Sequence, residues 1–285
     1  MSVVASTPPR PRRRLALRRW WPVAIIALVV LAAILAPWLA PYDPNAQNLA
    51  GRLKPPGTVS RSFHYWLGSD ELGRDLLSRI IHGARVSLIV AFASVILSGT
   101  VGTVLGMIAG YRRGLIETVV MRVVDIFLSI PAVLLAIITV AVLGPSLVNV
   151  IMVLALTRWP RYARVAYSQT LSVATMPYVR LAALMGAGSG RILFRHILPN
   201  IIGAVSVVAT LEFGLMVLFE AGLSFLGLGV QPPTASWGAM LSTGRNYVAT
   251  AWWAATLPGL CLFVLVLAVN LTGDAVRDRL DPRFR

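Results

Sequence analysis

Residues 178–200 read YVRLAALMGAGSGRILFRHILPN and interrupt an otherwise apolar part of the chain. Apolar runs at 147–167 and 200–223 lie on either side, and each is close to the roughly 20 residues that a helix needs to cross a bilayer. The stretch itself contains two short amphipathic pieces separated by a glycine-rich turn. This arrangement places a helix–turn–helix in water between two membrane spans, and it decides the fold class.

The composition of the chain agrees with a membrane protein. Of its 285 residues, 57% are hydrophobic and 13% are charged, whereas a soluble domain is nearer half apolar and about a quarter charged. The apolar residues gather in nearly uncharged windows that are long enough to span a bilayer. We therefore predict an all-α, polytopic membrane protein with six transmembrane helices. The predicted spans are 20–40, 84–110, 118–143, 147–167, 200–223 and 254–274.

Two other interpretations of the composition are less favoured. The run 20–40 follows arginines, as in a secretory signal, but its length and the five later runs favour a span. The net charge of +15 is typical of nucleic-acid-binding proteins, yet the arginines stand at the ends of apolar runs, where they set membrane topology. We therefore expect no nucleic-acid partner. The single cysteine, Cys261, lies in the last span and leaves no disulfide framework or metal cluster.

The distribution of basic residues predicts the orientation. Six spans put both termini on one side, and that side carries 18 of the 26 Lys and Arg residues, against seven on the other. Because cytoplasmic loops are enriched in Lys and Arg, the basic tail 1–19, the loop 168–198 and the tail 275–285 are predicted to lie in the cytoplasm.

Two segments are expected on the opposite side of the membrane. Within 41–83, apolar residues recur at helical spacing near Leu76 and Ile80, which predicts an amphipathic helix at the interface, before the five-helix core 84–274. The segment 225–247 is rich in Gly and Pro yet apolar, so we expect it to pack into the extracytoplasmic mouth of the bundle. Its candidate mouth residues are Phe225, Gln231 and Trp237.

The stretch 178–200 also has clear local signals. Pro177 suits a first helical turn, Gly186 suits a left-handed helix cap, and Ser189 suits an N-cap of the second piece. Small side chains around Gly186 leave little bulk at the bend, so the bend can enter a groove of another protein. From this pattern alone, a hairpin that lies along the membrane surface explains the stretch equally well.

This stretch resembles the cytoplasmic loop of ABC importer permeases. That loop has the pattern Glu-Ala-Ala, three residues, Gly, nine residues, Ile, one residue, Leu-Pro. Here the glycine is Gly186, and the one marked departure is Arg180 in place of the acid. The other matched positions are Leu181, Ala182, His196 (at the isoleucine position), Leu198 and Pro199.

Further segments at 67–88, 144–151, 159–165, 224–241 and 270–282 are similar to the C-type subunit of dipeptide and oligopeptide permeases. The resemblance therefore extends over nearly the whole chain. It implies that the loop is a coupling helix that docks into a cleft of a cytoplasmic ATPase. The residues it implies for coupling are Arg180, Leu181, Ala182, Ala183, Gly186, Arg191, Leu193, Arg195, His196, Leu198 and Pro199.

The same resemblance implies the partners and the cargo. We expect a bacterial inner-membrane permease with a homologous second permease subunit, two cytoplasmic ATPase subunits, an extracytoplasmic substrate-binding protein and surrounding lipid. ATP and Mg would be bound by the ATPase subunits, and no cofactor by this chain. Peptides are the expected cargo, although relatives with these motifs also carry nickel or haem-like compounds.

The sequence offers little for catalysis. It contains no Walker-type phosphate-binding motif, so we expect a transport subunit without its own ATPase site. An exporter or channel, an intramembrane enzyme and a non-transporting scaffold are the alternatives.

Charged residues inside spans are usually functional. Arg122 and Asp125, three residues apart, are expected to pair; Glu212 and Glu220, eight apart, either line the pathway or bond neighbouring helices. Gly102, Gly106 and Gly110 predict a close helix–helix contact.

Overall fold

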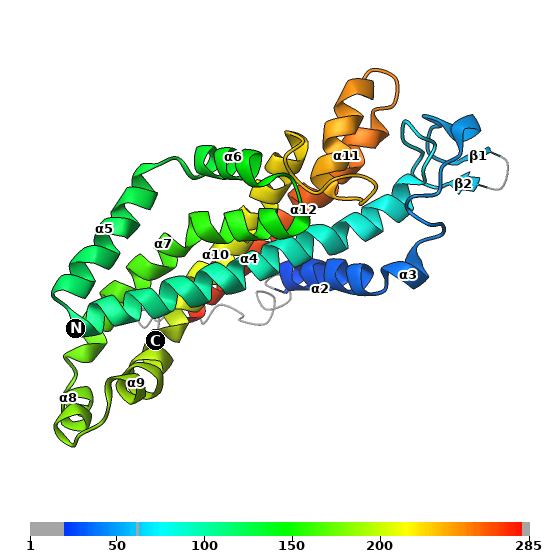
Figure 1. Ribbon diagram of the computed structural model, residues 1–285. Coiled ribbons are helices and arrows are strands. Elements are labelled where there is room, and N and C mark those ends of the chain that lie inside the picture. Colours follow the sequence, from blue (N-terminus) through cyan, green and yellow to red (C-terminus); the bar gives the residue numbers. More distant parts are fainter. Residues whose placement is uncertain (1–19, 61–62, 281–285) are drawn as a thin grey trace, which may run out of the picture.

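The computed structural model describes residues 20–60 and 63–280, and these are mostly helical. The tail 1–19 and the last five residues of the tail 275–285 lie outside the described part. Figure 1 shows an elongated bundle of long helices, with a helical hairpin projecting at one end and a small sheet at the other. The long helices are α4 (Leu76–Arg112), α7 (Leu147–Ala174), α10 (Leu198–Phe225) and α12 (Trp253–Leu280).

The number of membrane-spanning helices differs from the six that the sequence predicts. By length and hydropathy, three helices of the described chain qualify, Leu76–Arg112, Ser189–Phe225 and Trp253–Asp278, and a bent pair makes up to four. α7 is not among them and contains three arginines between residues 158 and 164. The helical bundle is therefore confirmed, whereas six uniform spans are not.

The run 20–40 forms a shorter helix than predicted. α2 (Trp21–Ile34) has 14 residues, and a single turn, α3 (Ala36–Leu39), follows it. Pro37 has no N–H to donate to the carbonyl group four residues earlier, so the helix is interrupted there. α2 packs against α4 and α12.

The predicted span 118–143 is broken. It forms α5 (Leu115–Ser129) and α6 (Ala132–Leu143), which are bent by 91°. Ile130, the residue before Pro131, is extended, with φ −92° and ψ 130°. A proline restricts its predecessor to such angles because its ring clashes with a helical conformation there. The segment predicted as one span is therefore two helices that meet at a bend, and the proline explains the break.

The amphipathic helix expected within 41–83 is not a separate element. Leu76 and Ile80 belong to the first turns of α4, which continues without a break to Arg112. Asp75 caps this helix, since its carboxylate accepts hydrogen bonds from the Ser78 amide at 2.8 Å and the Ser78 hydroxyl at 2.7 Å. Burial raises the pKa of the Asp75 carboxyl above its ordinary value.

The chain before α4 folds into a small lobe at the end of the bundle. It contains the turn η1 (Leu49–Gly51) and the antiparallel strands β1 (Thr58–Ser60) and β2 (Phe63–Tyr65). Asp70 joins this lobe to the helix: its carboxylate accepts from Arg74 Nε at 2.6 Å and lies 3.4 Å from Arg79 Nε. The lobe therefore has its own ionic connection to the start of α4.

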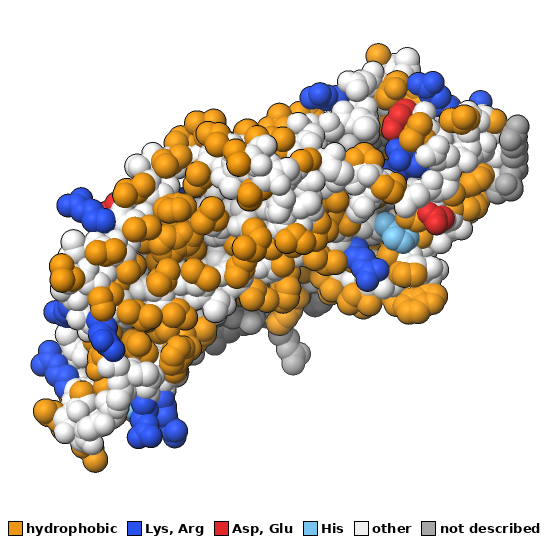
Figure 2. All heavy atoms as spheres, viewed as in Figure 1, with side chains coloured by type: hydrophobic (Ala, Val, Ile, Leu, Met, Phe, Trp, Pro, Cys, Tyr) orange, Lys and Arg blue, Asp and Glu red, His pale blue; other side chains and the backbone are white. Residues whose placement is uncertain are grey.

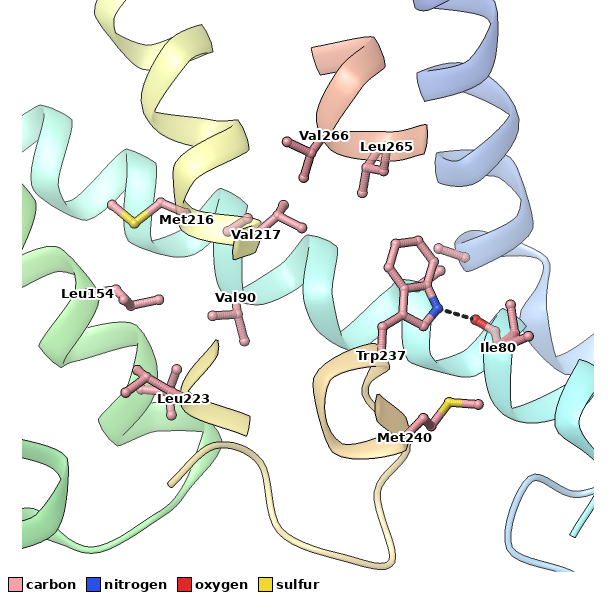
Figure 3. Packing of buried hydrophobic residues seen from close by; sticks show 14 of the residues in the cluster. Ile80, Val90, Leu154, Met216, Val217, Leu223, Trp237, Met240, Leu265 and Val266 are labelled. Atoms are coloured by element: carbon pink, nitrogen blue, oxygen red, sulfur yellow. Dashed lines mark hydrogen bonds between the residues drawn. The ribbon is translucent and has the colours of Figure 1, made fainter. Parts of the chain in front are cut away.

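The segment 225–247 folds against the bundle as predicted for a packed loop, and Trp237 is buried in this contact. Trp237 is the first residue of α11 (Trp237–Gly244), and the turn η3 (Arg245–Tyr247) follows this helix. α11 packs against α10 and α12. The Trp237 side chain is only 2% exposed and its Nε1 donates to the Ile80 carbonyl at 2.9 Å (Figure 3). Trp237 is therefore a core residue, and its place at an extracytoplasmic mouth stays a prediction.

The other two candidate mouth residues are more accessible. Phe225 is half-buried, and the guanidinium of Arg245 lies 4.8 Å from the centre of its ring. Gln231 is exposed, and its side-chain amide donates to the carbonyl groups of Gly227 and Gly229, each at 3.1 Å. Both residues stabilise the loop itself.

The predicted glycine contact is confirmed. Gly102, Gly106 and Gly110 of α4 all face α7. A Cβ atom at Gly106 would collide with the carbonyl oxygen of Ala163, and one at Gly102 would collide with that of Trp159. α4 and α7 are therefore close enough that only hydrogen atoms fit between their backbones at these positions.

Substitution of Gly106 tests this contact. We expect Gly106→Ala to lower the stability by about 1–3 kcal/mol, because overpacking displaces α7. Gly222→Ala in α10 is a matched control, since a Cβ atom there meets nothing within 4 Å. Thermal unfolding in detergent measures both changes. An unchanged melting temperature for Gly106→Ala would contradict the close contact.

Substitution of Trp237 tests the assignment of the core. Trp237→Ala should destabilise the protein by roughly 3–5 kcal/mol, as is usual for a large buried side chain. Trp38→Ala, at a side chain that is 80% exposed, should change the melting temperature little. Equal melting temperatures for the two variants would show that Trp237 does not support the core.

Candidate functional site

The projecting hairpin consists of α8 (Pro177–Leu184) and α9 (Ser189–Arg191). Pro177 occupies the first helical turn, as predicted. Gly186 has φ +85°, so the predicted left-handed cap is confirmed. The Gly186 amide donates to the Ala183 carbonyl and the Ala187 amide to the Ala182 carbonyl, each at 3.0 Å. This pair of bonds is the Schellman motif, which satisfies the last carbonyl groups of a helix.

The second half of the hairpin continues directly into the bundle. α9 leads through a wider, π-helical turn η2 (Ile192–Ile197) into α10, so the helix runs from Ser189 to Phe225. Pro199 therefore lies inside a continuous helix; it has no N–H for the Arg195 carbonyl, which fits the wider turn just before it. The prediction that Ser189 caps the second helix was wrong, because Gly188 is the N-cap.

One face of the hairpin is buried against the bundle. Val179, Ile192 and Ile197 are almost fully buried, and they pack in one cluster with Met107 of α4 and Tyr162 of α7. Leu193, expected to contact a partner, is only 8% exposed and belongs to the same cluster. The sequence pattern identified the apolar face correctly, but this face is covered by the chain itself.

A second connection joins the two halves of the hairpin. The side-chain amide of Asn200 donates to the Tyr178 hydroxyl at 2.9 Å and to the His196 carbonyl at 2.6 Å. The rings of Tyr178 and His196 are 6.3 Å apart. α8 is therefore fastened to the beginning of α10, and the hairpin is a firm extension of the bundle.

The tip of the hairpin is apolar and open to solvent. Leu184 and Met185 are 84% and 87% exposed, and Leu181 is also exposed. Figure 2 shows arginine or lysine side chains gathered around this end of the molecule. Among the candidate coupling residues, Arg180, Leu181, Ala183, Gly186, Arg191, Arg195 and Pro199 are exposed, and Ala182, His196 and Leu198 are half-buried. Large apolar side chains grouped at an exposed projection are typical of a protein interaction site.

A cluster of charged residues joins α5, α7 and α10, and only its Arg158 and Glu212 members are buried. Glu212 of α10 is 2% exposed and is 3.6 Å from Arg158 and 3.2 Å from Arg161, both of α7. Asp125 of α5 pairs with Arg164, again of α7. The predicted pairing of Asp125 with Arg122 was therefore wrong: the partner comes from a different helix, and Arg122 is exposed.

Glu220 lies in a different environment from Glu212. It is fully buried, and its carboxylate accepts hydrogen bonds from the Ser87 hydroxyl of α4 and the Ser224 hydroxyl, each at 2.8 Å. The Ser236 hydroxyl lies 3.4 Å from that of Ser224. Of the two roles that the sequence left open, both residues have the bonding of neighbouring helices, and Glu212 also lines a cavity of about 370 Å³.

Sequence reasoning missed the role of Arg158, Arg161 and Arg164. They were counted with the cytoplasmic basic residues although the predicted span 147–167 contains them, and α7 includes all three and continues to Ala174. Their spacing of three residues, which places them along one side of a helix, was the available signal. Among the described residues, no group of three or more His, Cys, Asp or Glu side chains could hold a metal ion.

Comparisons with known proteins identify the family. Residues 102–285 match the family described as binding-protein-dependent transport system inner membrane component, and residues 23–56 match the N-terminal TM domain of oligopeptide transport permease C. A solved structure, an inward-facing conformation of the MetNI methionine ABC transporter, aligns with a TM-score of 0.57 at 20% identity. The alignment covers 71% of this chain and 96% of the methionine transporter chain, and it shows that the two chains share a fold.

Curated relatives align along most of the chain. The di/tripeptide transport system permease protein DppC of Pseudomonas aeruginosa is 45% identical, over 90% of this chain and 86% of that protein. The probable D,D-dipeptide transport system permease protein DdpC of Escherichia coli is 41% identical, with 91% and 85% covered. The nickel transport system permease protein NikC of Escherichia coli is 43% identical, with 91% and 92% covered. From these matches, the chain belongs to the family of binding-protein-dependent transport system inner membrane components.

Proposed function

We propose that this chain is the permease subunit of an ATP-driven importer of dipeptides or short oligopeptides. The single observation that supports the coupling role is the exposed apolar tip around Leu184 and Met185, on a hairpin that projects from the end of the helical bundle. The cargo is inferred from the names of the di/tripeptide and D,D-dipeptide relatives at 45% and 41% identity. The nickel relative at 43% identity makes nickel the second candidate.

The hairpin is the proposed contact with a cytoplasmic ATPase. Leu181, Leu184 and Met185 enter a groove of the ATPase, and Gly186 lets the chain turn there without a side chain. Arg180, Arg191 and Arg195 lie at the rim, where acidic residues of the ATPase are the fitting partners. Leu193 acts differently, since it anchors the hairpin to the bundle.

Motion of the ATPase is transmitted through the helix that follows. The hairpin is fastened to α10 by Asn200 and by the buried cluster around Ile197, and the helix continues from Ser189 to Phe225. A displacement of the tip therefore moves the helix that carries Glu212. In this mechanism the bundle alternates between openings to the two sides of the membrane, and the chain itself needs no ATPase site.

The proposed assembly contains this chain, a homologous permease, two ATPase subunits that bind ATP and Mg, and a substrate-binding protein. The hairpin and both termini face the cytoplasm of a bacterial cell, and the lobe of residues 41–75 with α11 faces the binding protein. This orientation follows from the excess of arginines on the hairpin side.

A substitution at the tip tests the coupling role. Leu184→Ser should weaken ATPase binding about tenfold or more, because burial of a leucine side chain contributes roughly 1.5–3 kcal/mol. Leu49→Ser is the matched control, since Leu49 of the turn η1 is 70% exposed and belongs to the lobe at the opposite end of the molecule (Figure 1). Affinity of the purified permease pair for the ATPase subunits is the measurement, and neither variant should lose thermal stability. Normal ATPase binding by Leu184→Ser would contradict the docking role.

The cargo is tested in the same preparation. Proteoliposomes with the complete transporter and its binding protein should accumulate a labelled dipeptide when ATP is enclosed with the ATPases, and excess nickel should not compete. Competition by nickel together with nickel uptake would favour the second candidate.

Labelling of introduced cysteines tests the orientation. In a Cys261→Ala background, Leu184→Cys and Ala249→Cys, both at exposed positions, should react from opposite sides of the membrane. An impermeant thiol reagent added to intact cells is expected to label the second and not the first. Labelling of Leu184→Cys from outside would reverse the proposed topology.

A further inference from the structure

The cavity beside Glu212 lies between α5, α7 and α10 and has a volume of about 370 Å³. Its walls are apolar side chains from all three helices, among them Leu128, Val165 and Leu211. Arg161 and Arg164 complete the lining on the α7 side. A cavity of this size, with apolar walls and a few charged groups, has the usual character of a small-molecule site.

The charges at this cavity do not cancel. Arg158, Arg161 and Arg164 contribute three positive charges, and Glu212 and Asp125 contribute two negative ones, which leaves one positive charge in excess. Glu212 is shared between two arginines, and the buried Nε of Arg158 and the buried Oε2 of Glu212 each have no hydrogen-bond partner in the described chain. The excess positive charge therefore remains on the arginines, and a further anion would neutralise it.

Two of the arginines are accessible to such an anion. The side chains of Arg161 and Arg164 are 55% and 52% exposed, although both are beside the buried cluster. In Arg161, the bond to Glu212 uses one nitrogen, Nη1, at 3.2 Å. A guanidinium carries five N–H donors in a planar fork that matches a carboxylate, so Arg161 retains donors for a second partner.

A polar track continues from the cavity along α7. Arg161, Arg164, Ser168 and Ser172 are all exposed and follow one another at spacings of three and four residues, so they share one side of the helix. Such a face is unfavourable against lipid chains and is found along substrate pathways or protein contacts. The track runs from the cavity toward the end of α7 that leads into the hairpin.

We propose that this cavity holds the terminal carboxylate of a peptide during transport, with Arg161 and Arg164 as its ligands. The inference rests on the proposed peptide cargo. The carboxylate lies against the two guanidinium groups, and the apolar walls accept an adjoining side chain. A bare divalent cation does not suit two arginines and a net positive charge. Glu212 and Arg158 hold Arg161 in place from behind.

The test uses the complete transporter in proteoliposomes, with its binding protein saturated by a free-acid dipeptide in every arm. Arg161→Gln should reduce peptide uptake per ATP hydrolysed roughly tenfold, because it removes a charge-assisted hydrogen bond. Arg161→Lys keeps the positive charge but lacks the planar pair of N–H donors, so it should retain part of the uptake. Arg85→Gln is the control, since Arg85 is an exposed arginine of α4 outside the cavity. ATPase binding and melting temperature should stay at the wild-type values in all variants.

A second measurement reports the site directly. A photoreactive benzoyl-phenylalanine in place of Leu128, on the cavity wall, should cross-link a labelled dipeptide during turnover, and Arg161→Gln should remove the cross-link. Normal uptake and cross-linking in Arg161→Gln would overturn the carboxylate site while leaving the peptide importer intact. If Arg161→Gln lost uptake and also had a lower melting temperature or weaker ATPase binding, the carboxylate site would likewise be overturned, in favour of a structural role for Arg161. Failure of the wild-type transporter to move any peptide would refute both proposals.

Discussion

The close contact between α4 and α7 determines the positions of most other elements. Gly102, Gly106 and Gly110 bring the two backbones together, with Ala163 and Trp159 on the facing helix. Because apolar side chains gain little by leaving lipid, close backbone packing is a main source of helix association in a membrane. Once α7 is held in this way, its other side faces α5 and α10, and that side carries the arginines.

The charged cluster depends on this placement. Arg158 and Arg161 reach Glu212 of α10, and Arg164 reaches Asp125 of α5, so three helices meet at one group of charges. The guanidinium of Arg158 also lies 4.1 Å from the centre of the Phe219 ring. Charges inside such a bundle are costly without partners, and this cost makes the mutual arrangement of α5, α7 and α10 specific.

The hairpin and the charged cluster are parts of one mechanical unit. α10 begins at the hairpin and carries Glu212 farther along the same continuous helix. The Asn200 bond and the buried cluster around Ile197 hold the hairpin against that helix. The proposed ATPase contact at Leu184 and the proposed carboxylate site at Arg161 are thus connected without an intervening flexible segment.

The helical membrane class, the family and the local form of the hairpin were all predictable from the amino-acid sequence. The left-handed turn at Gly186 and the first turn at Pro177 depend on neighbouring residues, so local rules of helix ends predict them. The glycine spacing on α4 likewise predicted one close contact, because it depends on a single helical face. These features needed no knowledge of which distant segments meet.

The partners of the charged and apolar side chains depend on the three-dimensional arrangement of the helices. Asp125 meets Arg164 rather than Arg122, Leu193 faces the bundle rather than a partner, and Trp237 enters the core beside Ile80. The break at Pro131 was visible in the sequence, but its 91° angle depends on how α5 and α6 pack on α7. The spacing of residues along a helix indicates that one face is apolar or charged. The identity of the residues that this face contacts depends on segments that are far apart in the chain.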